Sequence, residues 1–342
     1  MKAIFFEQHG GPEVLRFADL SDPQPKTGQA LIKVKAVALN HLDIWVRRGW
    51  KGLHLEMPHI TGSDIAGEIV SVNAESNWTP GTRVVINPGI NTAEDEWTRS
   101  GEESVSPGYR IIGEQIRGGL AQYICVPIEN VFKLPEHVSF EQGCAPLLVG
   151  TTCWRMLFDR GKLQAGDSVL VVGAGGGVNA LSIQLAKRAG AQVFALAGGN
   201  DKKERALELG ADYVVDYKAN TNWPVEILKL SKGRGVDLVI DNVGRATIEK
   251  SIRSVARGGR IVTVGNTSGP EFTFDNRMLF TKQVSIIGST MGSKQDFIDV
   301  TEFMWTNNIV PAIDRIAPLE DGISMLQRLE KGDQFGKIIL VP

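Results

Sequence analysis

Cysteine is scarce in this sequence. Its 342 residues include three cysteines, Cys125, Cys144 and Cys153, and no two of them form a short-spaced pair. An odd and sparse set of this kind does not build a disulfide framework or a zinc site made of thiolates. It is typical of a protein kept in a reducing compartment, so we expect a cytoplasmic location.

The sequence also lacks a dominant charge and a long apolar run. Lysine and arginine number 37, aspartate and glutamate number 39, and the net charge is −2. This balance argues against a nucleic-acid-binding surface or a polybasic membrane patch. No apolar run approaches the roughly 20 residues of a membrane span, and the run after the first lysine is too short for a signal peptide. We therefore expect a small-molecule substrate as the partner, with neither nucleic acid nor a membrane.

The first part of the chain has the pattern of a β-rich domain. Short alternating segments are separated by clusters of proline and glycine, which predicts strands joined by turns. We expect a short helix at 42–48 and a long polar surface loop at 90–113. The predicted strands span residues 2–6, 30–38, 66–72, 83–87 and 122–127.

After residue 135 the pattern changes to apolar strands that alternate with helices. Such alternation predicts βαβ units and a parallel sheet covered on both faces. The sequence therefore predicts an α/β protein with a β-rich domain of residues 1–134 and 293–342 and a dinucleotide-binding domain of residues 135–292. The predicted strands span 168–172, 192–197, 213–217, 237–244, 259–265 and 284–288, and the predicted helices span 141–160, 179–189, 202–209, 296–306 and 319–330.

A glycine-rich stretch, GAGGGV at 173–178, lies between a predicted buried strand and a helix. Glycines let the chain turn sharply and let backbone N–H groups approach a pyrophosphate, and the start of the helix adds partial positive charge. The alternative is a plain tight turn. Asn179 stands where the usual fingerprint has its last glycine. The predicted cofactor-binding residues here are Gly173, Gly175, Gly176, Gly177 and Val178.

The end of the second strand of this domain indicates which dinucleotide is bound. NAD enzymes usually place an acid there for the ribose hydroxyls, whereas a 2′-phosphate needs cations. Here the strand ends in Ala197 and Gly198 without an acid, and Lys202 follows. We therefore predict NADP(H). Asp201 beside the lysine opposes this interpretation, and Lys202 alone is also compatible with a solvated position.

The order of these motifs resembles the medium-chain dehydrogenase/reductase superfamily, close to its quinone-oxidoreductase branch. The resemblance runs nearly end to end and implies a Rossmann-type domain together with a GroES-like catalytic domain. It is carried by GGPEVL at 10–15, VALNHLDIWVRRG at 37–49, PHITGSDIAGEIV at 58–70, PGTRVV at 80–85, GGLAQY at 118–123, LGADYVVDY at 209–217, GRGVDLVIDNVG at 233–244, ARGGRIVTVGNTSG at 256–269 and FGKIILVP at 335–342.

The resemblance also shows which residues stand at the metal positions of zinc-dependent relatives. The catalytic-zinc positions match Asn40, Ser63 and Leu148, none of which supplies an imidazole or a thiolate. Relatives with a structural zinc lobe carry four cysteines in the spacing C-x2-C-x2-C-x7-C. The resemblance therefore implies that this chain binds no metal. The lobe spacing falls on Thr92, Asp95, Thr98 and Ser106.

Hydride transfer from a nicotinamide proceeds without an ionising side chain when the acceptor is already electron-poor. We therefore predict a zinc-independent, NADPH-dependent oxidoreductase that acts on a quinone or an α,β-unsaturated carbonyl. The candidate catalytic residues are Asn40, His41 and Thr152. Asn40 would donate a hydrogen bond to the substrate or cap the helix at 42–48, His41 would relay a proton or be structural, and Thr152 would contact the nicotinamide or only pack its helix.

Further cofactor contacts are implied at strand ends, where α/β sheets bind ligands. By resemblance Tyr217 joins Lys202 at the 2′-phosphate, although it is also compatible with a core-edge aromatic. Asn242, Gly265 and Asn266 follow the fourth and fifth strands. The sixth strand is expected at the sheet edge, which favours a homodimer. Two other functions stay open, namely a non-catalytic NADPH-binding structural or redox-sensing protein and a zinc alcohol dehydrogenase.

Overall fold

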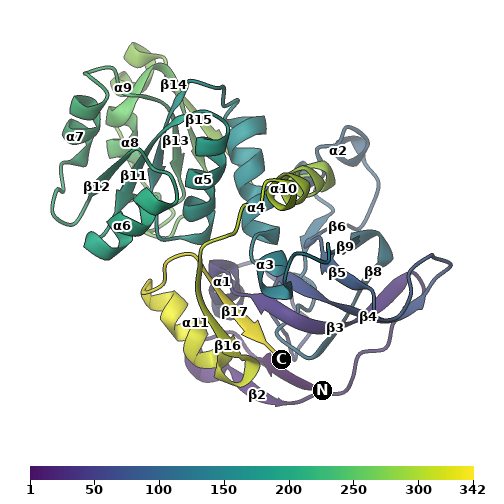
Figure 1. Ribbon diagram of the computed structural model, residues 1–342. Coiled ribbons are helices and arrows are strands. Elements are labelled where there is room, and N and C mark those ends of the chain that lie inside the picture. Colours follow the sequence, from purple (N-terminus) through teal and green to yellow (C-terminus); the bar gives the residue numbers. More distant parts are fainter. The chain divides into compact units, whose positions relative to one another are not determined.

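The computed structural model describes all residues from 1 to 342 and divides into two compact units (Figure 1). The first unit contains Met1–Thr151 and Gly292–Pro342, so both termini belong to it, and the second contains Thr152–Met291. The predicted boundary at residue 135 differs from this division. Residues 135–151 belong to the first unit because the helix α3 (Phe140–Cys144) packs on the strands β3 (Gln29–Ala38) and β4 (Asp64–Asn73). Val138, Cys144 and Leu147 lie in the same apolar cluster as Ala36 and Ala66.

The first unit is built on a seven-stranded sheet in the order β16-β17-β3-β4-β5-β9, with β8 paired to β3. The elements of this unit are β1 (Lys2–Phe5), η1 (Pro12–Val14), β2 (Arg16–Asp19), β3 (Gln29–Ala38), α1 (His41–Arg48), β4 (Asp64–Asn73), β5 (Arg83–Ile86), β6 (Gly89–Asn91), α2 (Glu96–Arg99), η2 (Glu103–Val105), β7 (Tyr109–Ile111), β8 (Tyr123–Pro127), η3 (Ile128–Asn130), β9 (Val131–Lys133), α3 (Phe140–Cys144), α4 (Leu147–Trp154), α10 (Lys294–Thr306), β16 (Ile313–Pro318), η5 (Leu319–Asp321), α11 (Gly322–Lys331) and β17 (Lys337–Val341).

The register of three strands in this sheet brings distant parts of the sequence together. Strand β17 runs antiparallel to β3, with Ile339 opposite Ala38. Strand β4 pairs with the other edge of β3, with Asp64 also opposite Ala38. Because side chains two residues apart share a face, the register continued by two residues sets Lys337 opposite Asn40. Residues near positions 40, 64 and 337 therefore meet at one end of the sheet.

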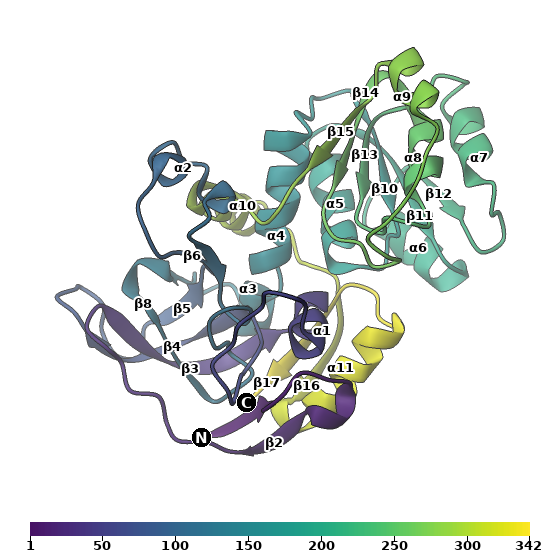
Figure 2. The same cartoon turned by 180° about the vertical axis from the view of Figure 1, so that it is seen from behind.

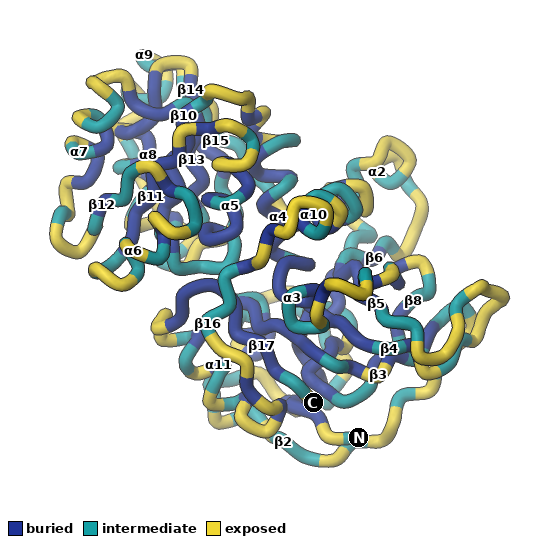
Figure 3. The backbone as a smooth tube through the Cα atoms, in the orientation of Figure 1, coloured by how far each residue is buried: buried dark blue, intermediate teal, exposed yellow.

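The polar segment predicted as a loop at 90–113 contains short elements of its own. Strands β6 and β7 pair with each other, and α2 and η2 lie between them. Much of this segment is exposed (Figure 3), and α2 within it is seen from behind in Figure 2. We call residues 92–108 the lobe.

The second unit is the predicted parallel sheet, in the order β12-β11-β10-β13-β14-β15. Strands β10, β11 and β13 are almost wholly buried, as expected for strands covered on both faces (Figure 3). Its elements are the π-helix η4 (Arg155–Arg160), β10 (Ser168–Val172), α5 (Gly177–Arg188), β11 (Gln192–Ala197), α6 (Asn200–Glu208), β12 (Tyr213–Asp216), α7 (Trp223–Leu230), β13 (Val236–Asp241), α8 (Ile248–Ser254), β14 (Val255–Thr263), α9 (Asn276–Lys282) and β15 (Ser285–Gly288).

The direction of winding reverses between β10 and β13. From β10 the chain passes outward through α5 and α6 to β12, then returns through α7 to β13 and continues outward to β15. Right-handed crossovers in opposite directions set α5 and α6 on one face and α7, α8 and α9 on the other. The reversal leaves a crevice at the carboxyl ends of β10 and β13, the usual ligand site of such sheets.

The prediction of one continuous helix over 141–160 is wrong. Helix α3 ends at Cys144, α4 begins at Leu147, and the chain from Arg155 is π-helical. Pro146 explains the break, because a proline has no N–H to continue the hydrogen-bond ladder. No helix in the structure has the length and apolar character required to cross a membrane.

Candidate functional site

The glycine loop follows β10 directly, at the point where the winding reverses. Gly173 has a φ of +90°, a left-handed conformation in which a side chain would be strained. The Ala174 N–H donates to the Leu196 carbonyl at 2.7 Å and holds the loop against β11. Gly176 is the N-cap of α5. Because the first N–H groups of a helix have no partner within it, this turn suits a pyrophosphate. Gly173, Gly175, Gly176, Gly177 and Val178 thus share one strand-to-helix turn.

Asn179 clamps this turn with its side chain. Its Nδ2 donates to the Val172 carbonyl at 2.7 Å and to the Gly173 carbonyl at 2.6 Å, and it lies 3.2 Å from Asn242 Oδ1. Asn179 is 3% exposed, and its Oδ1 has no partner. The residue that departs from the glycine fingerprint therefore ties the end of β10 to Asn242 after β13. A free, buried acceptor of this kind suits a ligand donor at the crevice.

The predicted residues after β13 and β14 also lie together. The Ser268 N–H donates to the Val243 carbonyl at 2.9 Å. A Cβ built on Gly244 would lie 3.4 Å from the Asn266 Cα. Asn242, Gly265 and Asn266 therefore sit at adjacent carboxyl strand ends. Their contact with a cofactor stays a prediction.

Side chains that follow β12 lie over the end of β11. A Cβ on Gly198 would lie 2.6 Å from Tyr217 Oη and 3.0 Å from Lys218 Cε, so both side chains lie over this glycine. The turn is held by Asp216, whose carboxylate accepts the Lys218 N–H at 2.8 Å, and this hydrogen bond lowers the pKa of Asp216. Lys202 lies in the first turn of α6, and its contact with Tyr217 stays a prediction.

In the first unit, Asn40 belongs to a buried polar cluster that we call the lysine cluster, made of Asn40, Asp64 and Lys337. Lys337 Nζ donates to Asp64 Oδ2 at 2.8 Å and to Asn40 Oδ1 at 2.5 Å, and Asn40 Nδ2 donates to the same Asp64 oxygen at 3.0 Å. Asp64 Oδ1 accepts the Leu148 N–H at 2.6 Å. The three side chains are 6%, 0% and 3% exposed. The cluster thus joins a buried ammonium, a buried carboxylate and an amide by mutual hydrogen bonds.

Asn40 is at the same time the N-cap residue of α1, as the alternative interpretation predicted. Its backbone N–H donates to Asp43 Oδ2 at 2.7 Å, and the Gly62 N–H donates to Asp43 Oδ1 at 2.8 Å. Burial raises the pKa of Asp43 to about 6, against these two hydrogen bonds. Burial lowers the pKa of the neighbouring His41, and the charge of Lys337 lowers it further. His41 is therefore neutral at pH 7.

Thr152 belongs to the second unit, with the cofactor residues. It is 3% exposed, and its Oγ1 lies 3.8 Å from Met291 Sδ. This contact fits the packing interpretation of Thr152, and its role toward a nicotinamide stays a prediction.

The positions that hold metal in zinc-dependent relatives do not fit a metal here. Asn40 is bonded to an ammonium, Ser63 offers only a hydroxyl and Leu148 offers no donor side chain. In the lobe, Ser106 Oγ donates to Asp95 Oδ2 at 2.6 Å, the Thr98 N–H donates to Asp95 Oδ1 at 2.9 Å, and Thr92 Oγ1 donates to the Gly108 carbonyl at 3.0 Å. No group of three or more histidine, cysteine, aspartate or glutamate side chains is arranged to hold a metal ion.

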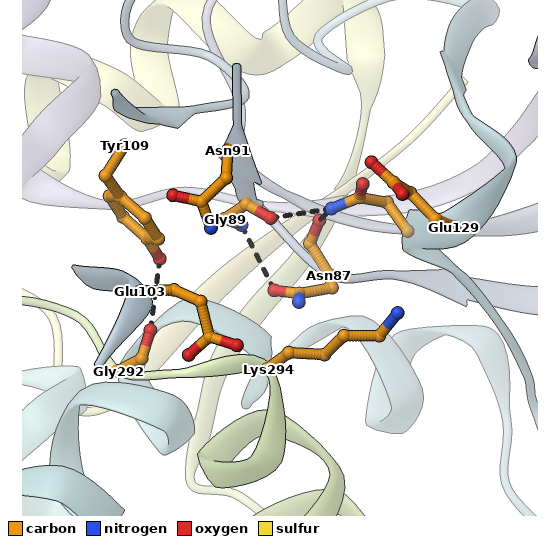
Figure 4. A pocket seen from close by; sticks show the side chains of 9 residues that line it. Asn87, Gly89, Asn91, Glu103, Tyr109, Glu129, Gly292 and Lys294 are labelled. Atoms are coloured by element: carbon orange, nitrogen blue, oxygen red, sulfur yellow. Dashed lines mark hydrogen bonds between the residues drawn. The ribbon is translucent and has the colours of Figure 1, made fainter. Parts of the chain in front are cut away.

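A polar cavity of about 130 Å³ lies beside the lobe, in the first unit. Glu103, Tyr109 and Lys294 reach it from three separate segments (Figure 4). Tyr109 Oη donates to the Gly292 carbonyl at 3.3 Å, whereas Asn91 Oδ1 and Glu103 Oε2 are buried without a protein partner. A polar space of this size takes ordered water, which satisfies such acceptors.

The sequence reasoning missed three of these residues. Lys337 belongs to the segment FGKIILVP at 335–342, in which the apolar run indicates a strand but no local signal shows that the lysine is buried. Lys218 follows the third strand next to Tyr217, and Asn179 was noted only as a departure. In each case the role depends on long-range pairing of strands.

The chain matches two family models. Residues 26–136 match the alcohol dehydrogenase GroES-like domain, and residues 177–306 match the zinc-binding dehydrogenase domain. The NAD-dependent alcohol dehydrogenase of Sulfurisphaera tokodaii is 30% identical over the whole of both chains. The quinone oxidoreductase of Homo sapiens is 31% identical, over 100% of this chain and 98% of the relative.

Solved structures agree with this result. An NAD-dependent alcohol dehydrogenase is 40% identical to this chain, with a TM-score of 0.95 over the full length of both. The predicted α/β fold, with a Rossmann-type and a GroES-like domain, is confirmed. This chain belongs to the medium-chain dehydrogenase/reductase superfamily.

Proposed function

We propose that this chain is an NADPH-dependent oxidoreductase that reduces a quinone or an α,β-unsaturated carbonyl without a metal ion. The observation that carries this proposal is the lysine cluster, in which Asn40, one of the three residues that match catalytic-zinc positions of relatives, is hydrogen-bonded to an ammonium. A plain alcohol needs a Lewis acid or a strong base to lose its proton. An electron-poor acceptor needs only a positioned hydrogen-bond donor, because the cofactor carries the chemistry.

The residues of the second unit support NADP(H) as the cofactor. The turn from Gly173 to Val178 suits the pyrophosphate, and the end of β11 has no acid for the ribose hydroxyls of NAD. Tyr217 Oη and the Lys218 side chain lie over Gly198, where they would hold a 2′-phosphate through charge-assisted hydrogen bonds. When bound, the reduced nicotinamide supplies a hydride.

The residues of the first unit would act on the acceptor. Asn40 donates a hydrogen bond to the acceptor oxygen, where negative charge develops. The neutral imidazole of His41 accepts a proton at one nitrogen and donates at the other, which suits the delivery of a proton to the product.

The second candidate is an NAD-dependent alcohol dehydrogenase. It is favoured by the relatives of that name, among them a solved structure at 40% identity. Its weakness is the set of residues at the metal positions, which offers an amide, a hydroxyl and no third ligand.

A single panel of assays separates these candidates. The purified protein is mixed with NADPH or NADH and with quinones, enones and enals, and in the reverse direction with NADP⁺ or NAD⁺ and alcohols. We expect NADPH oxidation by at least one quinone or enone and no alcohol oxidation. Alcohol oxidation with bound zinc supports the second candidate, and tight NADPH binding without any turnover supports a structural or redox-sensing protein.

Cofactor preference is tested separately by binding. Lys218→Ala should raise the Kd for NADPH about tenfold, from the loss of one charge-assisted contact of roughly 1.4 kcal/mol, and leave the Kd for NADH unchanged. Lys229→Ala, at an exposed lysine of α7, is the matched control. Equal loss of both cofactors would place the 2′-phosphate elsewhere.

We also propose that the chain forms a homodimer through β15. This strand is at the edge of the sheet, and open edges invite pairing with a second copy. Exposed aromatic side chains in the same unit, Phe272 and Phe280, offer apolar surface. Light scattering should give twice the mass of the chain, and a monomer mass would overturn this proposal.

A further inference from the structure

Lys337 carries a buried ammonium, and the backbone before it determines the face of the strand on which its side chain lies. Its side chain is 4% exposed, and it is the first residue of β17. Gly336 before it has a φ of +87°, and a Cβ there would lie 2.1 Å from the Ala312 carbonyl oxygen. Only glycine fits this turn, and the Lys337 N–H donates to the same carbonyl at 2.8 Å. The backbone thus fixes the face on which the lysine lies.

The charge of Lys337 is balanced by one carboxylate. Asp64 is 0% exposed and accepts from Lys337 Nζ, Asn40 Nδ2 and the Leu148 N–H. Removing one partner of a buried ion pair leaves an uncompensated charge, whereas removing both charges together is often tolerated. The two effects of Lys337, on charge balance and on Asn40, are therefore separable by mutation.

The lysine cluster also determines which way the Asn40 carboxamide points. An ammonium has only hydrogens to offer, so the atom 2.5 Å from it must be Oδ1, and the atom facing the Asp64 carboxylate must be Nδ2. One Nδ2 hydrogen goes to Asp64 at 3.0 Å. The other meets only the Ala38 carbonyl at 3.5 Å, the limit of a hydrogen bond. One Asn40 hydrogen therefore stays available to a better acceptor.

We propose that Lys337 is a positioning residue that orients the Asn40 carboxamide through a hydrogen bond to its Oδ1. This inference rests on the proposed function. With Oδ1 bound to the ammonium, electron density in the amide shifts toward oxygen, and the remaining Nδ2–H becomes a stronger donor.

The chemical step for an enone balances without a metal. Bound NADPH would supply the hydride and become NADP⁺ as its C4–H bond breaks, while a new C–H bond forms at the β-carbon and negative charge develops on the carbonyl oxygen. Asn40 donates a hydrogen bond to that oxygen and loses no proton. The α-carbon then takes a proton that comes from water through His41. Lys337 keeps its proton throughout and touches only Asn40 and Asp64.

The test uses two variants of the full-length protein. Lys337→Met alone leaves Asp64 unpaired and is expected to lower the melting temperature. The double variant Lys337→Met/Asp64→Asn removes the ion pair as a unit and should recover most of that loss, because neither partner is left as an unpaired charge. The control is Lys33→Met, at an exposed lysine of β3 in the same sheet. Each protein is assayed for melting temperature, NADPH affinity, kcat and KM with an enone.

We expect the double variant to fold and to bind NADPH like the wild type, but to lose roughly tenfold or more in kcat, in line with a misplaced oxyanion donor. The KM should change less than kcat. A double variant with wild-type kcat would show that Lys337 only balances charge and would overturn the inference.

A second readout does not depend on turnover. The side-chain amide signal of Asn40, identified by its loss in Asn40→Ala, is followed by ¹⁵N NMR. We expect it to move in the double variant and to stay in place in Lys33→Met. If the Asn40 signal does not move in the double variant, the inference about Lys337 is overturned, even if the wild type reduces no acceptor. If the signal moves but the wild type shows no turnover, only the proposed function is refuted.

Discussion

At the end of the seven-stranded sheet, Asn40 and Asp64 are joined by the ammonium of Lys337, whereas in the lobe Asp95, Thr98 and Ser106 are joined by hydrogen bonds alone. By resemblance, Asn40 in the first place and all three residues of the second match metal positions of zinc-dependent relatives. The first is fully buried, and the lobe is partly exposed.

The difference follows from burial. A carboxylate removed from water needs a counter-charge, because hydrogen bonds to neutral groups do not repay its desolvation. Asp95 is near solvent, so the hydroxyl of Ser106 and two backbone N–H groups suffice to satisfy its carboxylate. The buried carboxylate of Asp64 is therefore paired with a cation, whereas the more exposed carboxylate of Asp95 is satisfied by hydrogen bonds.

The largest expected effect is that of Asp64→Ala. It leaves the Lys337 ammonium buried without a carboxylate, which should lower the free energy of unfolding by about 3–5 kcal/mol. Chemical denaturation with urea measures this loss. A decrease in the free energy of unfolding below about 1 kcal/mol would mean that the cluster is hydrated like a surface ion pair. The buried cluster and the exposed lobe would then not differ in this respect.

The next effect concerns pH in the buried part of the first unit. His59 is 1% exposed and burial lowers its pKa to about 4. Below pH 6.5 the unfolded chain binds the proton first, so stability is lost as pH falls toward 4, by up to about 3 kcal/mol. Asp43, with its raised pKa of about 6, acts in the opposite direction over the same range.

Because of this opposition, His59 is tested by difference. The unfolding free energy of His59→Gln relative to the wild type should rise as pH falls from 6.5 to 4. Denaturation curves at several pH values measure it, and parallel profiles for the two proteins would show that His59 is solvated.

A smaller effect is expected for Asp95→Ala in the lobe. It removes the acceptor of the Ser106 hydroxyl and of two backbone N–H groups in an exposed segment. The melting temperature should fall less than in Asp64→Ala, while limited proteolysis should cleave more quickly within residues 92–108. A loss of stability equal to that of Asp64→Ala would show that the difference in exposure does not determine how much each carboxylate contributes to stability.

The smallest effect is expected from a chelator. Because neither place offers a metal-binding set, EDTA should change neither the melting temperature nor NADPH oxidation, and elemental analysis should find less than stoichiometric zinc. Stoichiometric zinc would contradict the conclusion that the residues of the lysine cluster and of the lobe do not bind a metal ion.

The sequence predicted the regular parts of the fold well. Strand β10, with its five apolar or small residues, and α5 after the glycine loop lie where local pattern sets them, within two residues. Patterns of this kind act over a few residues and do not need tertiary context. The predicted helix over 141–160 failed because the pattern of apolar residues outweighed the single breaker at Pro146.

Local sequence patterns could not predict the lysine cluster. Asn40 and Lys337 are 297 residues apart, and they meet only because β17 pairs with β3. The sequence identified Asn40 through the resemblance but gave no register for the last strand. Lys218 was missed for a similar reason, since its approach to Gly198 depends on the pairing of β12 with β11.

Because Gly336 fixes where the final strand begins, that strand is sensitive to a one-residue shift in its register. Successive side chains of a strand point to opposite faces, so deleting Ile338 while Ile339 stays paired with Ala38 would turn the lysine to the other face of the sheet, away from Asp64. Such a chain would keep its composition, length of strand and apolar character almost unchanged. It would nevertheless bury an unpaired Asp64, so a one-residue slip at the carboxyl end should be as damaging as a charge deletion in the middle of the sheet.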